Sequence, residues 1–138
     1  MSAIARGSWI SVLAIAAAWI AVQAQPKQPS VKRGKYIVED VAHCERCHTP
    51  RDERGNADRA RWLMGGPVQI RPTYPAPDWA AVAPPLAGQP PGTDAEVVKL
   101  LTTGIWKTGE PPKPPMLQFH MTEADARAVL AYLKSLGR

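Results

Sequence analysis

The sequence predicts a small all-α domain in which a few helices are joined by proline-rich loops. The chain has 138 residues, enough for one modest domain. Three segments, 30–48, 93–101 and 123–136, carry apolar residues at the three- and four-residue spacing of amphipathic helices. The intervening segments hold most of the 15 prolines, which disfavour long regular elements. These features exclude a multi-domain enzyme, a coiled coil and a polytopic membrane protein.

Residues 1–24 predict an export signal that precedes the domain. Arg6 is followed by an apolar run from Trp9 to Val22, and the small residues around Ala24 suit a signal peptidase. The run of 14 residues is shorter than the roughly 20 that a membrane span needs. An uncleaved membrane anchor and a buried helix are the alternatives. Residues 25–30 then form a tether, and the folded domain covers 31–138.

The remaining chain is poor in core-forming residues. Beyond residue 24, Leu, Ile, Val and Phe together number only 20. That is too few for an ordinary core in a domain of this size. A bound apolar group would compensate for the deficit, and without it we expect the chain to be largely unfolded.

The two cysteines lie in a Cys-x-x-Cys-His motif formed by Cys44, Cys47 and His48. A disulfide between them would close a very small loop, and a structural zinc site needs four ligands. A redox dithiol would follow a strand, and no strand pattern precedes the motif. On a helix both thiols share one face, which suits the two vinyl edges of a haem. The motif is the signature of c-type haem attachment, and it favours haem over the dithiol and zinc alternatives.

The segment before the motif predicts a helix that begins at the N-cap Ser30. Gly34 lies within its apolar stripe, although glycine is a poor helix former. We interpret Gly34 as the place where another helix crosses closely. The stripe consists of Gly34, Ile37, Val41, Cys44 and His48.

Motifs at both ends of the domain resemble a known family. The segments 33–37, 44–52 and 131–136 resemble those of class I, mono-haem cytochromes c, and in particular the small periplasmic cytochromes that accompany bacterial dehydrogenases. The resemblance implies a cytochrome c fold, with about three main helices and proline-rich loops wrapped round one covalently bound haem. It also implies His and Met as iron ligands, electron transfer in place of substrate chemistry, and a contact of Gly34 with Tyr132 or Val129.

The second iron ligand is predicted to be Met116. It lies in a proline-rich loop before the last helix, where prolines stiffen the chain, and the family carries its methionine in such a loop. Leu117 departs from the family pattern, in which another proline often follows. The site prediction is therefore Cys44 and Cys47 for haem attachment, with His48 and Met116 on iron and no catalytic residue. The other candidates for the second ligand are Met64, Met121, His43 and His120.

Capping signals delimit the two later helices. Thr93 and Glu96 form a capping box, and Gly104 is a stop signal. Thr122 is the N-cap of the last helix, with Met121 packing on its first turn. The chain from 50 to 91 is expected to be mostly loop. One indole among Trp62, Trp79 and Trp106 is a candidate donor to a haem propionate, and a carbonyl of Pro50 or Gly66 is a candidate partner for His48.

The sequence thus predicts an electron carrier between a periplasmic dehydrogenase and a terminal oxidase or another cytochrome. A haem peroxidase-like enzyme with a displaceable methionine, and a haem sensor or structural subunit, are the alternatives. The net charge of +5 fits either plain solubility or steering toward acidic redox partners. Nucleic acid is not an expected partner, and a membrane is one only if the N-terminal segment is uncleaved.

Overall fold

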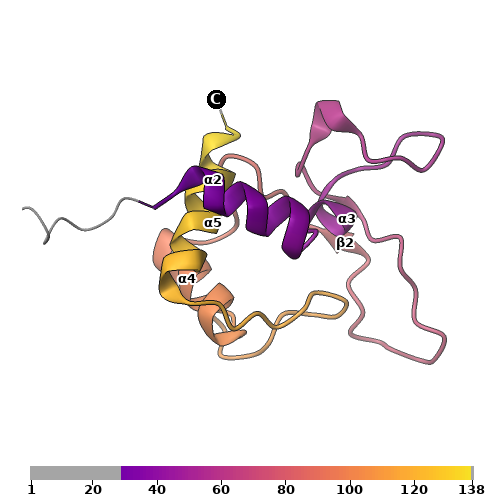
Figure 1. Cartoon of the computed structure of the whole chain (residues 1–138). Coiled ribbons are helices and arrows are strands. Elements are labelled where there is room, and N and C mark those ends of the chain that lie inside the picture. The colour runs from indigo at the N-terminus through magenta and orange to yellow at the C-terminus, as the bar shows by residue number, and fades with distance from the viewer. Residues whose placement is uncertain (1–28, 138) are drawn as a thin grey trace, which may run out of the picture.

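The computed structural model describes residues 29–137, so the predicted export signal and most of the tether lie outside the described residues. No helix within this range is long and apolar enough to cross a membrane. The elements are α2 (Val31–Tyr36), the π-turn η1 (Ile37–Val41), α3 (Glu45–His48), the 3-10 turn η2 (Arg59–Arg61), β1 (Gly66–Pro67), β2 (Val82–Ala83), α4 (Asp94–Thr103) and α5 (Glu123–Ser135). Figure 1 shows helices α2, α4 and α5 on one side of the molecule and extended loops on the other, which confirms the predicted all-α class.

Helices α2 and α5 cross at Gly34, as the resemblance implied. A Cβ at Gly34 would lie 1.9 Å from the Ala128 carbonyl oxygen and 2.8 Å from the Tyr132 Cβ. The crossing therefore confirms the contact with Tyr132 and adds Ala128, which the sequence did not single out. An ion pair between Arg33 and Asp125 joins the same two helices, with 2.9 Å between Nε and Oδ1.

The core lies among α2, η1, α4 and α5; Leu63 is the loop residue fully buried in it, and Trp62, Leu86 and Ala87 pack against its edge. Leu63 is fully buried, although it lies in an irregular segment between η2 and β1. Its burial fixes the loops against the helices. The buried apolar residues of this cluster are Ile37, Val38, Leu63, Val97, Leu101, Ala126, Val129, Leu130, Tyr132 and Leu133.

The two later helices begin and end where their capping signals predict. Thr93 and Glu96 form both hydrogen bonds of the capping box at the start of α4. Gly104 ends that helix in the left-handed conformation, with a φ of 70°. The Thr122 side chain accepts a hydrogen bond from the Asp125 N–H at the start of α5.

The first predicted helix is interrupted, which is a correction to the single stripe expected from 34 to 48. The chain changes from α-helix to π-turn after Tyr36, and the Ala42 N–H donates to the Ile37 carbonyl at 2.7 Å. A π-turn accommodates one more residue than an α-helical turn, so later side chains rotate away from the stripe. Val41 is consequently 57% exposed. His43 then adopts a φ of 49°, and α3 starts afresh.

The segment from 49 to 92 is mostly loop, as predicted, but it contains a short antiparallel ribbon. Gly66 pairs with Ala83, and Pro67 pairs with Val82. Main-chain hydrogen bonds anchor this segment to the rest of the molecule: the Gly88 N–H donates to the Leu133 carbonyl of α5 at 2.8 Å. Two-residue strands are too short to produce an alternating pattern, so the sequence does not reveal them.

Candidate cofactor site

The Cys-x-x-Cys-His motif is built around the short helix α3. Cys44 occupies the N-cap position with helical backbone angles, and Cys47 lies one turn later. Residues three apart on a helix face the same side. Both thiols are unpaired and partly buried. The arrangement therefore presents two free thiols from one helical turn.

His48 is held in one orientation by a main-chain carbonyl. The residue is 8% exposed, and its Nδ1 lies 2.8 Å from the Pro84 carbonyl oxygen. A carbonyl only accepts hydrogen bonds, so Nδ1 donates its proton and Nε2 keeps its lone pair. Burial lowers the pKa of His48, which favours the neutral ring. A neutral, oriented imidazole with a free Nε2 is suited to bind a metal ion.

The carbonyl partner of His48 corrects the sequence prediction, which named Pro50 or Gly66. The Pro50 carbonyl instead accepts a hydrogen bond from the Asp58 N–H at 2.9 Å. The ribbon β1–β2 returns the chain to α3, so that a residue 36 positions after His48 supplies the carbonyl. Without a visible strand pattern, the sequence gives no signal of this long-range contact.

The protonation of Cys44 argues against a reactive dithiol. Burial, together with the nearby Glu45 carboxylate, raises the pKa of the Cys44 thiol to about 11. Redox-active thiols have a lowered pKa and react as thiolates. Among residues 29–137, no group of three His, Cys, Asp or Glu side chains is placed to hold a metal ion. The raised pKa of Cys44 thus disfavours a redox dithiol, and attachment of a haem by Cys44 and Cys47 stays a prediction.

The methionines occupy three different environments. Met116 is partly buried in the loop that follows α4, and its N–H donates to the Lys113 carbonyl at 3.2 Å. Met121 packs against the core cluster, as expected of a residue that covers the first turn of α5. Met64 is 54% exposed. The assignment of Met116 to the iron stays a prediction.

The remaining histidine candidates have other surroundings. His43 Nδ1 lies 3.4 Å from the Glu45 carboxylate, immediately beside the motif. His120 is exposed just before α5. Neither position offers the buried, carbonyl-bonded environment of His48.

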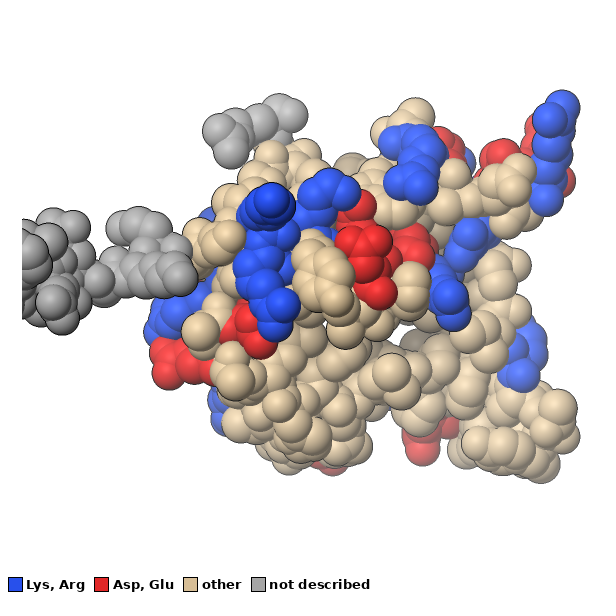
Figure 2. Space-filling model, in the orientation of Figure 1, with Lys and Arg blue, Asp and Glu red and all other residues tan. Residues whose placement is uncertain are grey.

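The middle of the molecule is hollowed, and its walls carry little charge. In Figure 2 the hollow lies below α2, and the atoms around it are mostly neither basic nor acidic. A porphyrin is a large apolar ring, so uncharged walls suit it, as do the two free thiols and the buried imidazole of the motif. The residues present therefore fit a covalently attached haem.

The three tryptophans differ in the use of their indole N–H groups. The Trp79 N–H donates to the Ile70 carbonyl at 2.9 Å, which holds the loop between the two strands. The Trp62 Nε1 is buried without a hydrogen-bond partner among the described residues, and Arg59 stacks on its ring at 4.1 Å. The contact of one indole with a propionate stays a prediction.

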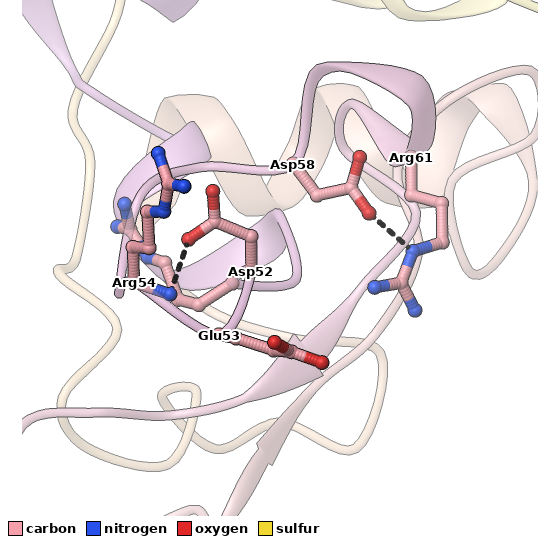
Figure 3. Close-up of a pocket in the computed structure, with 6 residues that line it drawn as sticks. Asp52, Glu53, Arg54, Asp58 and Arg61 are labelled. Carbon is pink, nitrogen blue, oxygen red and sulfur yellow. Dashed lines mark hydrogen bonds and ion pairs between the residues drawn. The ribbon is translucent and has the colours of Figure 1, made fainter.

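A separate charged pocket lies in the loop between α3 and η2. Figure 3 shows that its carboxylates are bonded within the loop: the Asp52 carboxylate accepts from the main-chain N–H of Arg54 at 2.9 Å, and the Asp58 carboxylate pairs with the Arg61 guanidinium at 2.7 Å. This pairing accounts for the charge-rich stretch of the sequence, because its charged side chains stabilise the loop by bonds within it. The lining residues are Arg51, Asp52, Glu53, Arg54, Asp58 and Arg61.

Comparison with known proteins assigns the family. The cytochrome c family model matches residues 31–137. The chain is 32% identical to "Diheme cytochrome c-type" of Cereibacter sphaeroides over 117 residues, which cover 77% of this chain and 35% of that protein. It is 29% identical over 110 residues to the "Fructose dehydrogenase cytochrome subunit" of Gluconobacter japonicus, covering 75% of this chain and 21% of that protein.

A third relative is the "Alcohol dehydrogenase (quinone), cytochrome c subunit" of Gluconacetobacter polyoxogenes, at 27% identity over 128 residues, covering 78% of this chain and 25% of that protein. The chain thus spans about a third or less of the length of these relatives. The family match and the helical architecture agree with each other. The chain belongs to the cytochrome c family of electron-transfer proteins with covalently bound haem c, near the class I members found as cytochrome subunits of bacterial dehydrogenases.

Proposed function

We propose that this chain is a periplasmic mono-haem cytochrome that passes electrons from a dehydrogenase to a terminal oxidase or another cytochrome. The observation that carries the proposal is the buried imidazole of His48, whose Nδ1 is bonded to the Pro84 carbonyl one turn after Cys44. That arrangement leaves Nε2 free for iron directly beside two thiols. It is the local geometry that a covalently held haem requires.

Each site residue has a role in this proposal. Cys44 and Cys47 would form the thioether bonds to a haem, and His48 and Met116 would be its protein ligands to iron. The haem supplies one-electron chemistry when bound, and a thioether ligand favours its ferrous form. If both His48 and Met116 bound iron, no coordination position would be left for a substrate.

The proposed stoichiometry is one haem for each chain. The sequence contains two cysteines, both within the single motif. One of the relatives is named as a diheme protein, and this chain matches only 35% of its length. A single attachment site in the matched part is consistent with one haem here.

The partners and the location are inferred from the relatives and from the N-terminal residues. Two relatives are named as cytochrome subunits of a fructose dehydrogenase and of a quinone-dependent alcohol dehydrogenase. A dehydrogenase is accordingly the proposed electron donor. Residues 1–24 have the pattern of an export signal, so we place the domain in the periplasm, either free or tethered by its N-terminus.

The central experiment expresses the chain in a host that attaches haem c and determines its mass and spectrum. We expect an added mass of one haem and a low-spin spectrum. Met116→Ala should remove the weak long-wavelength band of ferric iron bonded to sulfur. Met64→Ala and Met121→Ala are matched controls that should keep it. Survival of the band in Met116→Ala would refute the ligand assignment.

A kinetic measurement separates a carrier from an enzyme. We expect the reduced protein to pass electrons to an oxidised cytochrome while showing negligible turnover of peroxide. Rapid peroxide turnover would instead favour the peroxidase-like alternative. The ionic-strength dependence of the electron-transfer rate tests steering, because screened charges lose their effect at high salt; a flat profile would leave solubility as the role of the basic charge.

A further inference from the structure

The segment from Leu63 to Leu86 lies against the end of α3 and is joined to it by hydrogen bonds. The Gly65 N–H donates to the His48 carbonyl at 2.8 Å, and the buried Leu63 N–H donates to the Thr49 hydroxyl at 2.9 Å. The Leu86 N–H donates to the Leu63 carbonyl at 2.8 Å. These bonds join three parts of the chain into one unit: the segment just before β1, the segment just after β2 and the end of α3.

Gly65 lies where the segment before β1 closely approaches the main chain of residues 83–85. A Cβ at Gly65 would lie 2.7 Å from the Pro85 nitrogen, 2.8 Å from the Ala83 carbonyl oxygen and 2.9 Å from the Pro84 carbonyl carbon. All three distances are shorter than real Cβ contacts, and all three atoms are main-chain atoms that cannot rotate away. Gly65 also has a φ of 77°, which other residues adopt with strain.

One of these main-chain atoms belongs to the Pro84 carbonyl, which accepts the hydrogen bond from His48 Nδ1. Pro84 and Pro85 follow each other, so the fixed φ of both rings limits how this carbonyl can turn. The position of the Pro84 carbonyl relative to His48 is therefore set mainly by how closely the chain at Gly65 can approach.

We infer that Gly65 is a positioning residue for His48: its missing side chain lets the Pro84 carbonyl reach Nδ1 and so sets the reduction potential of the bound haem. The inference rests on the proposed function. A hydrogen bond from Nδ1 to a carbonyl increases the basicity of a ligating imidazole. A more basic ligand stabilises ferric iron, so loss of this bond moves the potential in the positive direction.

The test compares two glycine substitutions in the haem-loaded protein. Gly65→Ala is expected to shift the midpoint potential in the positive direction and to speed hydrogen exchange of the His48 Nδ1 proton. Gly55→Ala is the matched control, because Gly55 has a similar φ of 82° and no atom lies within 4 Å of an added Cβ. The control should keep both the wild-type potential and the wild-type exchange rate.

A second variant tests the role of Gly65 if Gly65→Ala cannot be obtained in haem-loaded form. Thr49→Val removes the acceptor of the Leu63 N–H and loosens the same unit without adding bulk, so a smaller positive shift is expected. An unchanged midpoint potential in haem-loaded Gly65→Ala would overturn the role of Gly65 but leave the proposed function intact. If Gly65→Ala cannot be loaded with haem, an unchanged potential in Thr49→Val would do the same. A wild-type protein that acquires no covalent haem would refute the proposed function and this assignment with it.

Discussion

The helical layer (α2, α4 and α5) and the loop layer (residues 49–92) are held together by different kinds of contact. The helices pack through apolar side chains and cross closely at Gly34. The loop layer contributes one fully buried apolar side chain, Leu63, to that cluster. Trp62, Leu86 and Ala87 pack against the edge of the cluster, and main-chain hydrogen bonds, among them those from the Gly65 and Gly88 N–H groups, hold the rest of the layer.

The two layers contribute different parts of the site. The helical layer and α3 supply the frame and the thiols, whereas the loop layer supplies the Pro84 carbonyl that orients His48. A second main-chain bond, from the Ala80 N–H to the Pro114 carbonyl at 2.7 Å, joins the loop layer to the segment that carries Met116. The part of the molecule with the least regular structure thus contacts the surroundings of both predicted iron ligands.

The largest effect should follow from removing the haem attachment. Cys44→Ala/Cys47→Ala is expected to abolish cooperative thermal unfolding of the whole domain, because too few apolar residues remain to stabilise the loop layer. Circular dichroism and calorimetry would measure the loss. The single variant Cys47→Ala, with one thioether, should give an intermediate result. A cooperative melt of the haem-free double variant would contradict this dependence.

The next largest effect concerns the helical layer. Gly34→Ala places a Cβ against the Ala128 carbonyl, so the two helices must move apart. We expect the free energy of unfolding of the haem-loaded protein to fall by about 3 kcal/mol. Chemical denaturation would measure it, with Lys32→Ala on the exposed side of the same helix as the control. A change below about 0.5 kcal/mol, typical of surface sites, would show that the crossing can relax.

The two layers also differ in how well the sequence predicted them. The ends of α4 and α5 were predicted from Thr93, Gly104 and Thr122, because capping is a local interaction between residues three or four apart. The π-turn was missed, since nothing in its composition distinguishes it from an α-helix. The Pro84 carbonyl was missed because its contact with His48 depends on a chain reversal between distant segments.

The residues of the site also differ in how well the sequence predicted them. The motif at Cys44, Cys47 and His48 was recognised from its spacing, and the structure places the three residues on one helical turn; their attachment of a haem stays a prediction. The residues that support His48 carry no chemical signature. Gly65 and Thr49 resemble any loop glycine or threonine until the fold brings them next to Pro84 and Leu63.

A change within the loop layer should have a moderate effect on stability. Thr49→Val keeps the shape of the side chain but removes the acceptor of the buried Leu63 N–H. A buried donor without a partner costs about 2 kcal/mol, and we expect the free energy of unfolding to fall by that amount. Thr73→Val, at an exposed loop position, is the control and should change little. Equal stabilities of the two variants would show that water satisfies the Leu63 donor.

The smallest effect concerns the polar contact between the helices, in which the Tyr132 hydroxyl donates to Glu39. Burial, reinforced by the Glu39 carboxylate, raises the pKa of Tyr132 from 10.0 to about 12. Between pH 10 and 12 the unfolded chain therefore loses a proton that the folded protein keeps, so stability falls as pH rises through that window. Below pH 10 the hydroxyl is protonated in both states and contributes no pH dependence.

Tyr132→Phe tests this sign directly. We expect the variant to lose about 1 kcal/mol at pH 7, because Glu39 loses a hydrogen bond, and to show a shallower decline between pH 10 and 12 than the wild type. Unfolding free energies measured across that range give both quantities. Tyr74→Phe, at a side chain that is 66% exposed, controls for the loss of any phenol. Parallel declines in the wild type and Tyr132→Phe would mean that the alkaline loss of stability arises in the loop layer instead of the helix crossing.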